Sequence, residues 1–121
     1  MLNWKDFLIL NYALLSDEKL AALSCGNNAD ALSVLTARYT EKARLCALSF
    51  KNSQVETEDL IQEAMIGFLS AVYSFRNDGT ASFSTYASHC IKNRVITVIR
   101  SAFSNKRIPA GLVIPLEETV N

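Results

Sequence analysis

Apolar residues recur every three or four positions through most of this chain, which is the spacing that places them along one side of an α-helix. Turn signals interrupt the pattern at residues 25–28, 51–53, 77–79 and 109–115. Between these breaks the pattern predicts helices over residues 4–15, 28–50, 58–75 and 83–103. We therefore expect an all-α fold, a compact helical bundle of four or five helices.

The helix expected from Glu58 to Phe75 separates its two sides most sharply. Its apolar stripe predicts the core and contains Leu60, Ile61, Ala64, Met65, Phe68, Ala71, Val72 and Phe75. Thr57 is expected to cap its start, where Glu58 and Asp59 suit the helix dipole. The opposite side carries Asp59, Gln62, Glu63, Ile66, Ser70 and Tyr73. An aliphatic side chain among carboxylates and an amide fits a small helix-docking site, although one exposed isoleucine is also normal on any surface.

Residues 83–103 contain conflicting signals. The β-branched run at 95–99 favours a strand, whereas apolar residues over the longer window follow one helical stripe. We expect a helix, with Ser84 as its cap. The other face then carries Tyr86, His89, Asn93, Ile96, Thr97 and Arg100, with Lys92 and Arg94 at its flanks. Aromatic, amide and cationic groups on one face suit DNA, although half-buried packing of Tyr86 and a surface role for His89 remain open alternatives.

The charges are unevenly distributed along a chain whose net charge is zero. Ten acidic and seven basic residues precede Gly79, and the segment 79–115 holds five basic residues and no acidic one. This basic segment is consistent with contacts to nucleic acid, or with an ordinary solvated face. The 121 residues are 50% hydrophobic and 20% charged, which is typical of one globular domain. Overall neutrality predicts weak DNA binding by the isolated domain.

Candidate chemistry is sparse. Three widely spaced cysteines and one histidine form no recognisable metal-binding pattern, so we expect no metal and no cofactor, and reduced thiols in a cytoplasmic protein. No nucleophile and base pair is suggested, which argues against an enzyme. The apolar stretch at 7–15 is too short to cross a bilayer and lacks the features of a signal peptide, so we expect no membrane partner. Residues 4–15 are instead expected to form a short amphipathic or partly buried helix.

Several motifs in one order resemble the second conserved region of bacterial RNA polymerase sigma factors of the sigma-70 family. They are the DLIQEAMIGFL run at 59–69, the FSTYA run at 83–87 and the RIP run at 107–109. The resemblance covers roughly residues 16–109. The Cys90-Ile91 pair and the tail around Pro109 and Pro115 are similar to alternative sigma factors of the stationary-phase and sporulation type.

The resemblance implies a transcription initiation factor domain that binds core RNA polymerase and that recognises and melts the promoter minus-ten element. Contacts with the clamp helices of the polymerase β′ subunit are then expected at Asp59, Gln62, Glu63 and Ile66. Contacts with promoter DNA are expected at Phe75, Phe83, Tyr86, His89, Lys92, Asn93, Arg94, Ile96, Arg100, Lys106 and Arg107. Among these, the aromatic residues would help to capture a flipped base, and the lysines and Arg94 and Arg107 would contact phosphates. An anti-sigma factor is a further candidate partner.

The chain departs from the family pattern in two places. Housekeeping sigma factors carry a pair of tryptophans where this chain has His89 and Cys90, so we expect weaker melting and a more restricted set of promoters. The later helix-turn-helix that reads the minus-thirty-five element is not in this sequence. An excised domain and a naturally shorter protein both remain open.

The expected organisation is an N-terminal amphipathic helix at 1–15, a region 2 domain at 16–103, and a basic linker and tail at 104–121. One alternative function is a helical adaptor that binds polymerase or an anti-sigma factor without recognising DNA. Such an adaptor would need no cluster of basic residues after Gly79. Another alternative is a repressor-like helix-turn-helix, which would bind duplex DNA stably by itself.

Overall fold

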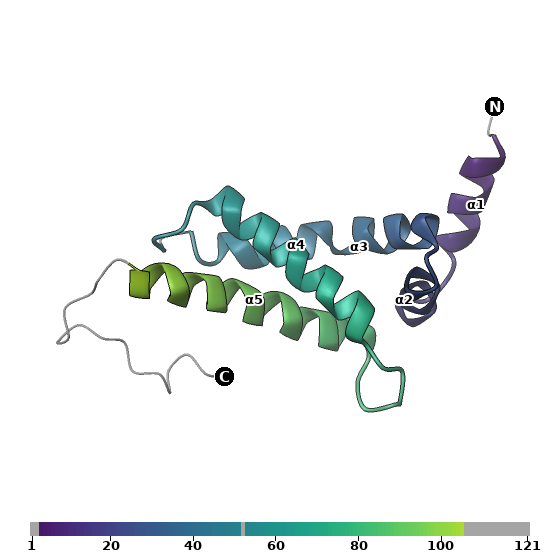
Figure 1. Ribbon diagram of the computed structural model, residues 1–121. Helices are drawn as coiled ribbons and strands as arrows, with labels where there is room; N and C mark the ends of the chain where they lie inside the picture. The colour runs from purple at the N-terminus through teal and green to yellow at the C-terminus, as the bar shows by residue number, and fades with distance from the viewer. Residues whose placement is uncertain (1–2, 52, 106–121) are drawn as a thin grey trace.

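The computed structural model describes residues 3–51 and 53–105, and these residues form five α-helices. In chain order they are α1 (Trp4–Tyr12), α2 (Asp17–Cys25), α3 (Ala29–Leu48), α4 (Thr57–Ser74) and α5 (Phe83–Asn105). The long helices α3, α4 and α5 lie side by side, and α2 sits at one end of them (Figure 1). The expectation of an all-α bundle is confirmed, with no strand in the part of the chain described.

Two of the expected helix caps are wrong, although both helices form. The hydroxyl of Ser82, not Ser84, accepts the Thr85 backbone N–H at 3.1 Å and caps α5. Thr57 is the first residue of α4 rather than its cap, and the preceding Glu56 makes no side-chain capping bond. The β-branched residues at 95–99 lie within α5, because their apolar members continue its buried stripe.

The core consists of the apolar stripes of α3, α4 and α5 together with Leu20 and Ala21 of α2, and aromatic rings fill its centre. Tyr39 of α3 stacks on Phe68 of α4 at 5.3 Å between ring centroids, and Phe83 of α5 meets Tyr39 edge-on at 5.5 Å. The predicted stripe of α4 is confirmed as its inward side, and five of its eight members are buried, namely Leu60, Ala64, Phe68, Ala71 and Val72. The other three pack against the core half-buried.

Gly67 permits an unusually close approach of α4 to α5. A Cβ atom at this position would lie 2.8 Å from the carbonyl oxygen of Cys90 and 3.0 Å from both Ile91 Cα and Arg94 Cβ. Even an alanine would therefore push the two helices apart. This contact sets how the surfaces of α4 and α5 lie relative to each other.

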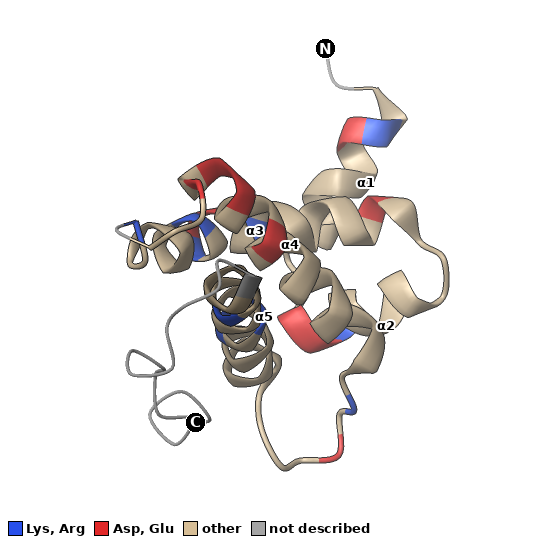
Figure 2. Cartoon of the chain, turned by 60° about the vertical axis from the view of Figure 1, so that its left-hand side comes forward, with Lys and Arg blue, Asp and Glu red and all other residues tan. Residues whose placement is uncertain are grey.

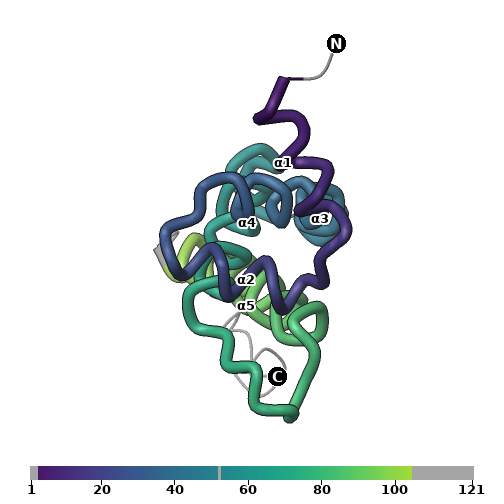
Figure 3. Tube along the Cα trace, turned by 90° about the vertical axis from the view of Figure 1, so that its right-hand side faces the viewer, coloured from purple at the N-terminus to yellow at the C-terminus, as the bar shows by residue number. Residues whose placement is uncertain are grey.

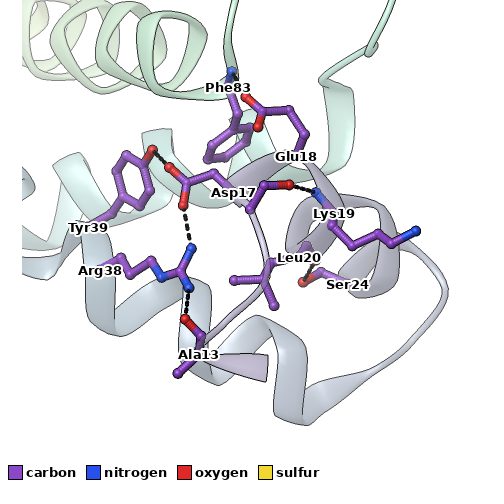
Figure 4. Close-up of polar contacts among 10 residues, drawn as sticks. Ala13, Asp17, Glu18, Lys19, Leu20, Ser24, Arg38, Tyr39 and Phe83 are labelled. Atoms are coloured by element: carbon purple, nitrogen blue, oxygen red, sulfur yellow. Dashed lines mark hydrogen bonds and ion pairs between the residues drawn. The ribbon is translucent and has the colours of Figure 1, made fainter. Parts of the chain in front are cut away.

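The start of α2 ties the bundle together through two carboxylates (Figure 4). Asp17 accepts hydrogen bonds from Tyr39 Oη at 2.5 Å and from Arg38 Nη1 at 2.7 Å. Glu18 Oε2 accepts the backbone N–H of Phe83 at 2.7 Å, which satisfies a free donor in the first turn of α5. These contacts fix the N-terminal end of α5 against α2 and α3.

The first helix, α1, is the least integrated element. It has no buried residue and leads away from the bundle toward the N-terminus (Figure 3). Polar contacts hold its C-terminal end, where Asn28 Nδ2 donates to Tyr12 Oη at 2.9 Å and Arg38 Nη2 donates to the Ala13 carbonyl at 2.9 Å. Trp4 and Phe7 stay largely exposed. No helix in the described ranges combines the length and apolar character that crossing a bilayer requires.

Candidate functional site

The side of α4 opposite the core presents four residues that we call the acidic face: Asp59, Gln62, Glu63 and Ile66. Three of them are exposed, including Ile66 with 43% of its surface accessible, and Glu63 is half-buried. The exposed Leu69 and Tyr73 extend the surface toward the end of the helix. Acidic residues mark the first turns of α4 in red (Figure 2). The helix therefore offers a partly apolar surface with negative charge at one end.

Glu63 is not a free carboxylate. Its Oε1 accepts a hydrogen bond from Arg94 Nε of α5 at 2.7 Å, and this contact is an ion pair between two different helices. Arg94 was expected to contact DNA phosphates, and Glu63 was expected to contact the polymerase. The structure brings these two residues together at the place where α4 and α5 approach each other around Gly67.

The three aromatic residues expected at the DNA do not share one environment. Phe83 is fully buried and packs against Tyr39, Phe68 and Phe75, so its ring is covered in this structure, and a contact with DNA at this position stays a prediction. The ring of Phe83 packs against the inner side of Phe75. Phe75 and Tyr86 are half-buried neighbours with ring centroids 5.6 Å apart. The Tyr86 hydroxyl lies 2.7 Å from Ser74 Oγ, so α4 holds it in place.

The remaining candidate residues follow one side of α5, which we call the α5 face: Tyr86, His89, Lys92, Asn93, Ile96 and Arg100. His89, Lys92 and Asn93 are exposed, whereas Ile96 and Arg100 are half-buried. Arg100 Nε is buried without a hydrogen-bond partner among the residues described. The two other basic residues expected at DNA, Lys106 and Arg107, lie outside the described residues.

The structure places one further positively charged side chain, Lys42, against α5, and the sequence pattern did not predict this. Lys42 of α3 reaches the first turns of α5, where its Nζ donates to Ser84 Oγ at 3.3 Å and to Ser88 Oγ at 3.2 Å. The same ammonium lies 5.7 Å from the centre of the Tyr39 ring. The helical pattern of α3 marks Lys42 as exposed, but only the packing of α3 against α5 brings it to the first turns of α5.

Within the described ranges, no three histidine, cysteine or acidic side chains lie close enough together to hold a metal ion. The three cysteines are free thiols. Burial raises the pKa of the Cys46 thiol, and the positive charge of Lys92 opposes this rise. The higher pKa keeps this thiol protonated and weakly nucleophilic.

Comparison with known proteins gives consistent results. The family model described as "Sigma-70 region 2" matches residues 35–103. The chain is 31% identical over 109 residues to the RNA polymerase sigma-H factor of Bacillus licheniformis, covering 90% of this chain and 49% of that protein. It is 30% identical over 109 residues to the sigma-H factor of Bacillus subtilis (strain 168), covering 90% of this chain and 50% of that protein. A sigma-E factor of Clostridium acetobutylicum is 34% identical over 68 residues, which are 56% of this chain and 29% of that protein.

The structure is an all-α bundle with an acidic surface on α4 and an aromatic and basic surface on α5. The match over residues 35–103, more than half of the chain, identifies the family, and the chain belongs to the sigma-70 family through its region 2. It spans about half the length of the curated relatives it matches over most of its own length.

Proposed function

We propose that this chain is the part of a transcription initiation factor that joins core RNA polymerase to promoter DNA, and that it acts without enzymatic chemistry of its own. The observation that carries the proposal is the placement of the α4 and α5 faces on two helices in close contact, within a chain of the sigma-70 region 2 family. Polymerase and DNA could then bind neighbouring surfaces at the same time.

The acidic face of α4 is the proposed contact with the clamp helices of the β′ subunit. Ile66 would fill an apolar pocket between the partner's side chains, and Gln62 and Asp59 would supply polar contacts around it. Helix docking of this kind uses residues three or four positions apart, and Asp59, Gln62 and Ile66 have that spacing.

The α5 face, together with Phe75, is the proposed contact with the minus-ten element. The half-buried Phe75–Tyr86 pair offers an aromatic platform for an unstacked base. Asn93 is exposed one turn beyond His89 and can hydrogen-bond to a base edge. Lys92 and Lys42 contribute positive charge for phosphates, which raises affinity without selecting sequence. Because His89 replaces a large aromatic ring of housekeeping relatives, we expect weaker melting of duplex DNA.

A titration against purified β′ clamp helices tests the polymerase contact. The double substitution Gln62→Ala and Ile66→Ala should weaken binding by about tenfold or more, because central contacts of an interface typically contribute 1–2 kcal/mol or more each. Both side chains are exposed, so the melting temperature should hardly change. Ser70→Ala, an exposed position on the same helix outside the acidic face, is the matched control. Equal affinities of the double variant and the control would show that the clamp does not bind this face.

A further inference from the structure

The ion pair between Glu63 and Arg94 connects the acidic face of α4, which is the proposed polymerase contact, to an arginine of α5 that the family resemblance places among the expected contacts with DNA phosphates. Arg94 Nε donates to Glu63 Oε1 at 2.7 Å. The Arg94 side chain is 45% exposed and the Glu63 side chain 28% exposed, so a partner can reach both. The pair lies beside Gly67, where a Cβ atom would come within 3.0 Å of Arg94 Cβ. Close helix contact therefore holds the two charged groups within reach of each other.

In this pair, Glu63 occupies the guanidinium of Arg94 that DNA would bind, and Arg94 occupies the carboxylate of Glu63 that the polymerase would bind. A guanidinium binds carboxylate and phosphate oxygens through the same N–H donors, so a DNA phosphate must compete with Glu63 for Arg94. A cationic side chain on the polymerase must in turn compete with Arg94 for Glu63. A partner at either surface must therefore break the Glu63–Arg94 ion pair. Once one partner has broken it, the second partner binds without that cost.

We propose that Glu63 masks Arg94 in the free protein, and that a partner which takes either side chain releases the other. This inference rests on the proposed function and adds a mechanism by which its two interfaces favour each other. The coupling is reciprocal, because the same contact is broken from either side. Since exposed ion pairs contribute modestly, the coupling amounts to at most about fivefold in affinity.

The substitution Glu63→Gln tests the masking directly, because it keeps the shape of the side chain and removes its charge. Affinity for a fluorescein-labelled oligo(dT) single strand is measured by anisotropy at low salt. Oligo(dT) is sufficient because a phosphate contact does not depend on base sequence. Release of Arg94 should raise the affinity by about two- to fivefold and make the logarithmic salt dependence steeper by about 0.7.

A second ion pair in the protein supplies a matched control. Glu41 accepts a hydrogen bond from Arg44 Nε at 3.0 Å on α3, and neither residue belongs to the acidic face or the α5 face. Glu41→Gln changes the net charge by the same amount and also frees an arginine. If it raises the affinity for oligo(dT) as much as Glu63→Gln does, the effect is one of general charge and the proposal is overturned.

The variant Arg94→Ala completes a double-mutant cycle. In this background Glu63→Gln should no longer raise the affinity for oligo(dT), and a gain that persists would refute the masking of Arg94. Arg94→Ala should also strengthen binding to the β′ clamp helices by the same two- to fivefold (about 1 kcal/mol at most) relative to Arg44→Ala. An unchanged clamp affinity would contradict the reciprocal half of the proposal.

The two proposals fail in different ways. If the wild-type chain does not bind the clamp helices, the proposed function fails, whereas the oligo(dT) comparison still decides whether Glu63 masks Arg94. If the clamp binds and Glu63→Gln behaves like Glu41→Gln, the proposed function stands and the masking is refuted. Thermal unfolding of each variant identifies any loss of fold. Glu63→Asp keeps the negative charge, so its affinity for oligo(dT) should rise less than that of Glu63→Gln.

Discussion

The Tyr39 hydroxyl joins the polar contacts of α2 to the aromatic core. Its ring stacks on Phe68, while its hydroxyl donates to Asp17 at 2.5 Å. Burial, and after it the hydrogen bond to Asp17, holds the pKa of Tyr39 far above its ordinary value of 10.0. The folded protein therefore keeps this proton at a pH at which the unfolded chain has released it. The stability that this group contributes is fully present below pH 10.0 and is lost as the pH rises toward the folded-state pKa.

We expect Tyr39→Phe to lower the free energy of unfolding by about 1.5–3 kcal/mol at pH 7, because a hydrogen bond to a charged group is lost. Above pH 10 the wild-type protein should lose stability faster than the variant, so the difference between them should shrink. Urea unfolding followed by circular dichroism over this pH range measures both effects. Tyr73→Phe, at an exposed tyrosine, is the control. Parallel stability curves for wild type and Tyr39→Phe would contradict this account.

Single-residue roles could be predicted only as far as helical spacing determines them. Spacing correctly placed Ile66 and Gln62 on the outside of α4. It could not separate Phe83 from Tyr86, because they lie three positions apart, and Phe83 is buried by rings from α3, α4 and the end of α4 that the local pattern does not show. The pairing of Glu63 with Arg94, 31 positions later, was likewise beyond the reach of a local pattern.

At the level of elements, the contact between α4 and α5 determines the geometry of the site. Gly67 brings α4 close to the middle of α5, and it lies one turn from Glu63 on the same helix. Glu18 of α2 holds the N-terminal end of α5 through the backbone of Phe83. These two contacts fix the orientation of the α5 face relative to the acidic face.

We expect Gly67→Ala to destabilise the protein by about 1–2 kcal/mol. Alanine favours the helix by about 1 kcal/mol, but its Cβ would clash with the backbone of Cys90, and overpacking of this kind costs about 1–3 kcal/mol or more. Gly26→Ala is the matched control, because its nearest contact would be an ordinary 3.4 Å and its φ is negative. Chemical denaturation measures both variants. If Gly67→Ala were as stable as wild type, the helices would not be in close contact here.

The helices themselves were predictable, and their ends were not. Apolar stripes persist over several turns, so they outweigh local preferences such as the β-branched run at 95–99. Caps depend on the backbone of the preceding turn and on which hydroxyl happens to face it. Ser82 and Ser84 both suit a cap by residue type, and only the geometry of the turn selects Ser82.

In the whole molecule, the acidic and basic segments of the sequence lie on two different helices. Acidic residues gather at the start of α4, and basic residues lie along α5 (Figure 2). The neutral total predicts weak DNA binding by the chain alone, and the ion pair between α4 and α5 weakens it further in our proposal. Under the proposed function, we therefore expect tight DNA binding only when a partner engages α4.

The most direct test of this account is the binding of single-stranded minus-ten DNA to the chain in the presence and absence of purified β′ clamp helices. We expect the clamp to bind the chain, and the complex then to bind minus-ten strands more tightly than scrambled strands of equal length. Clamp binding without any selective DNA binding would support the adaptor alternative. Failure of the chain to bind the clamp at all would contradict the central claim that α4 is a polymerase contact.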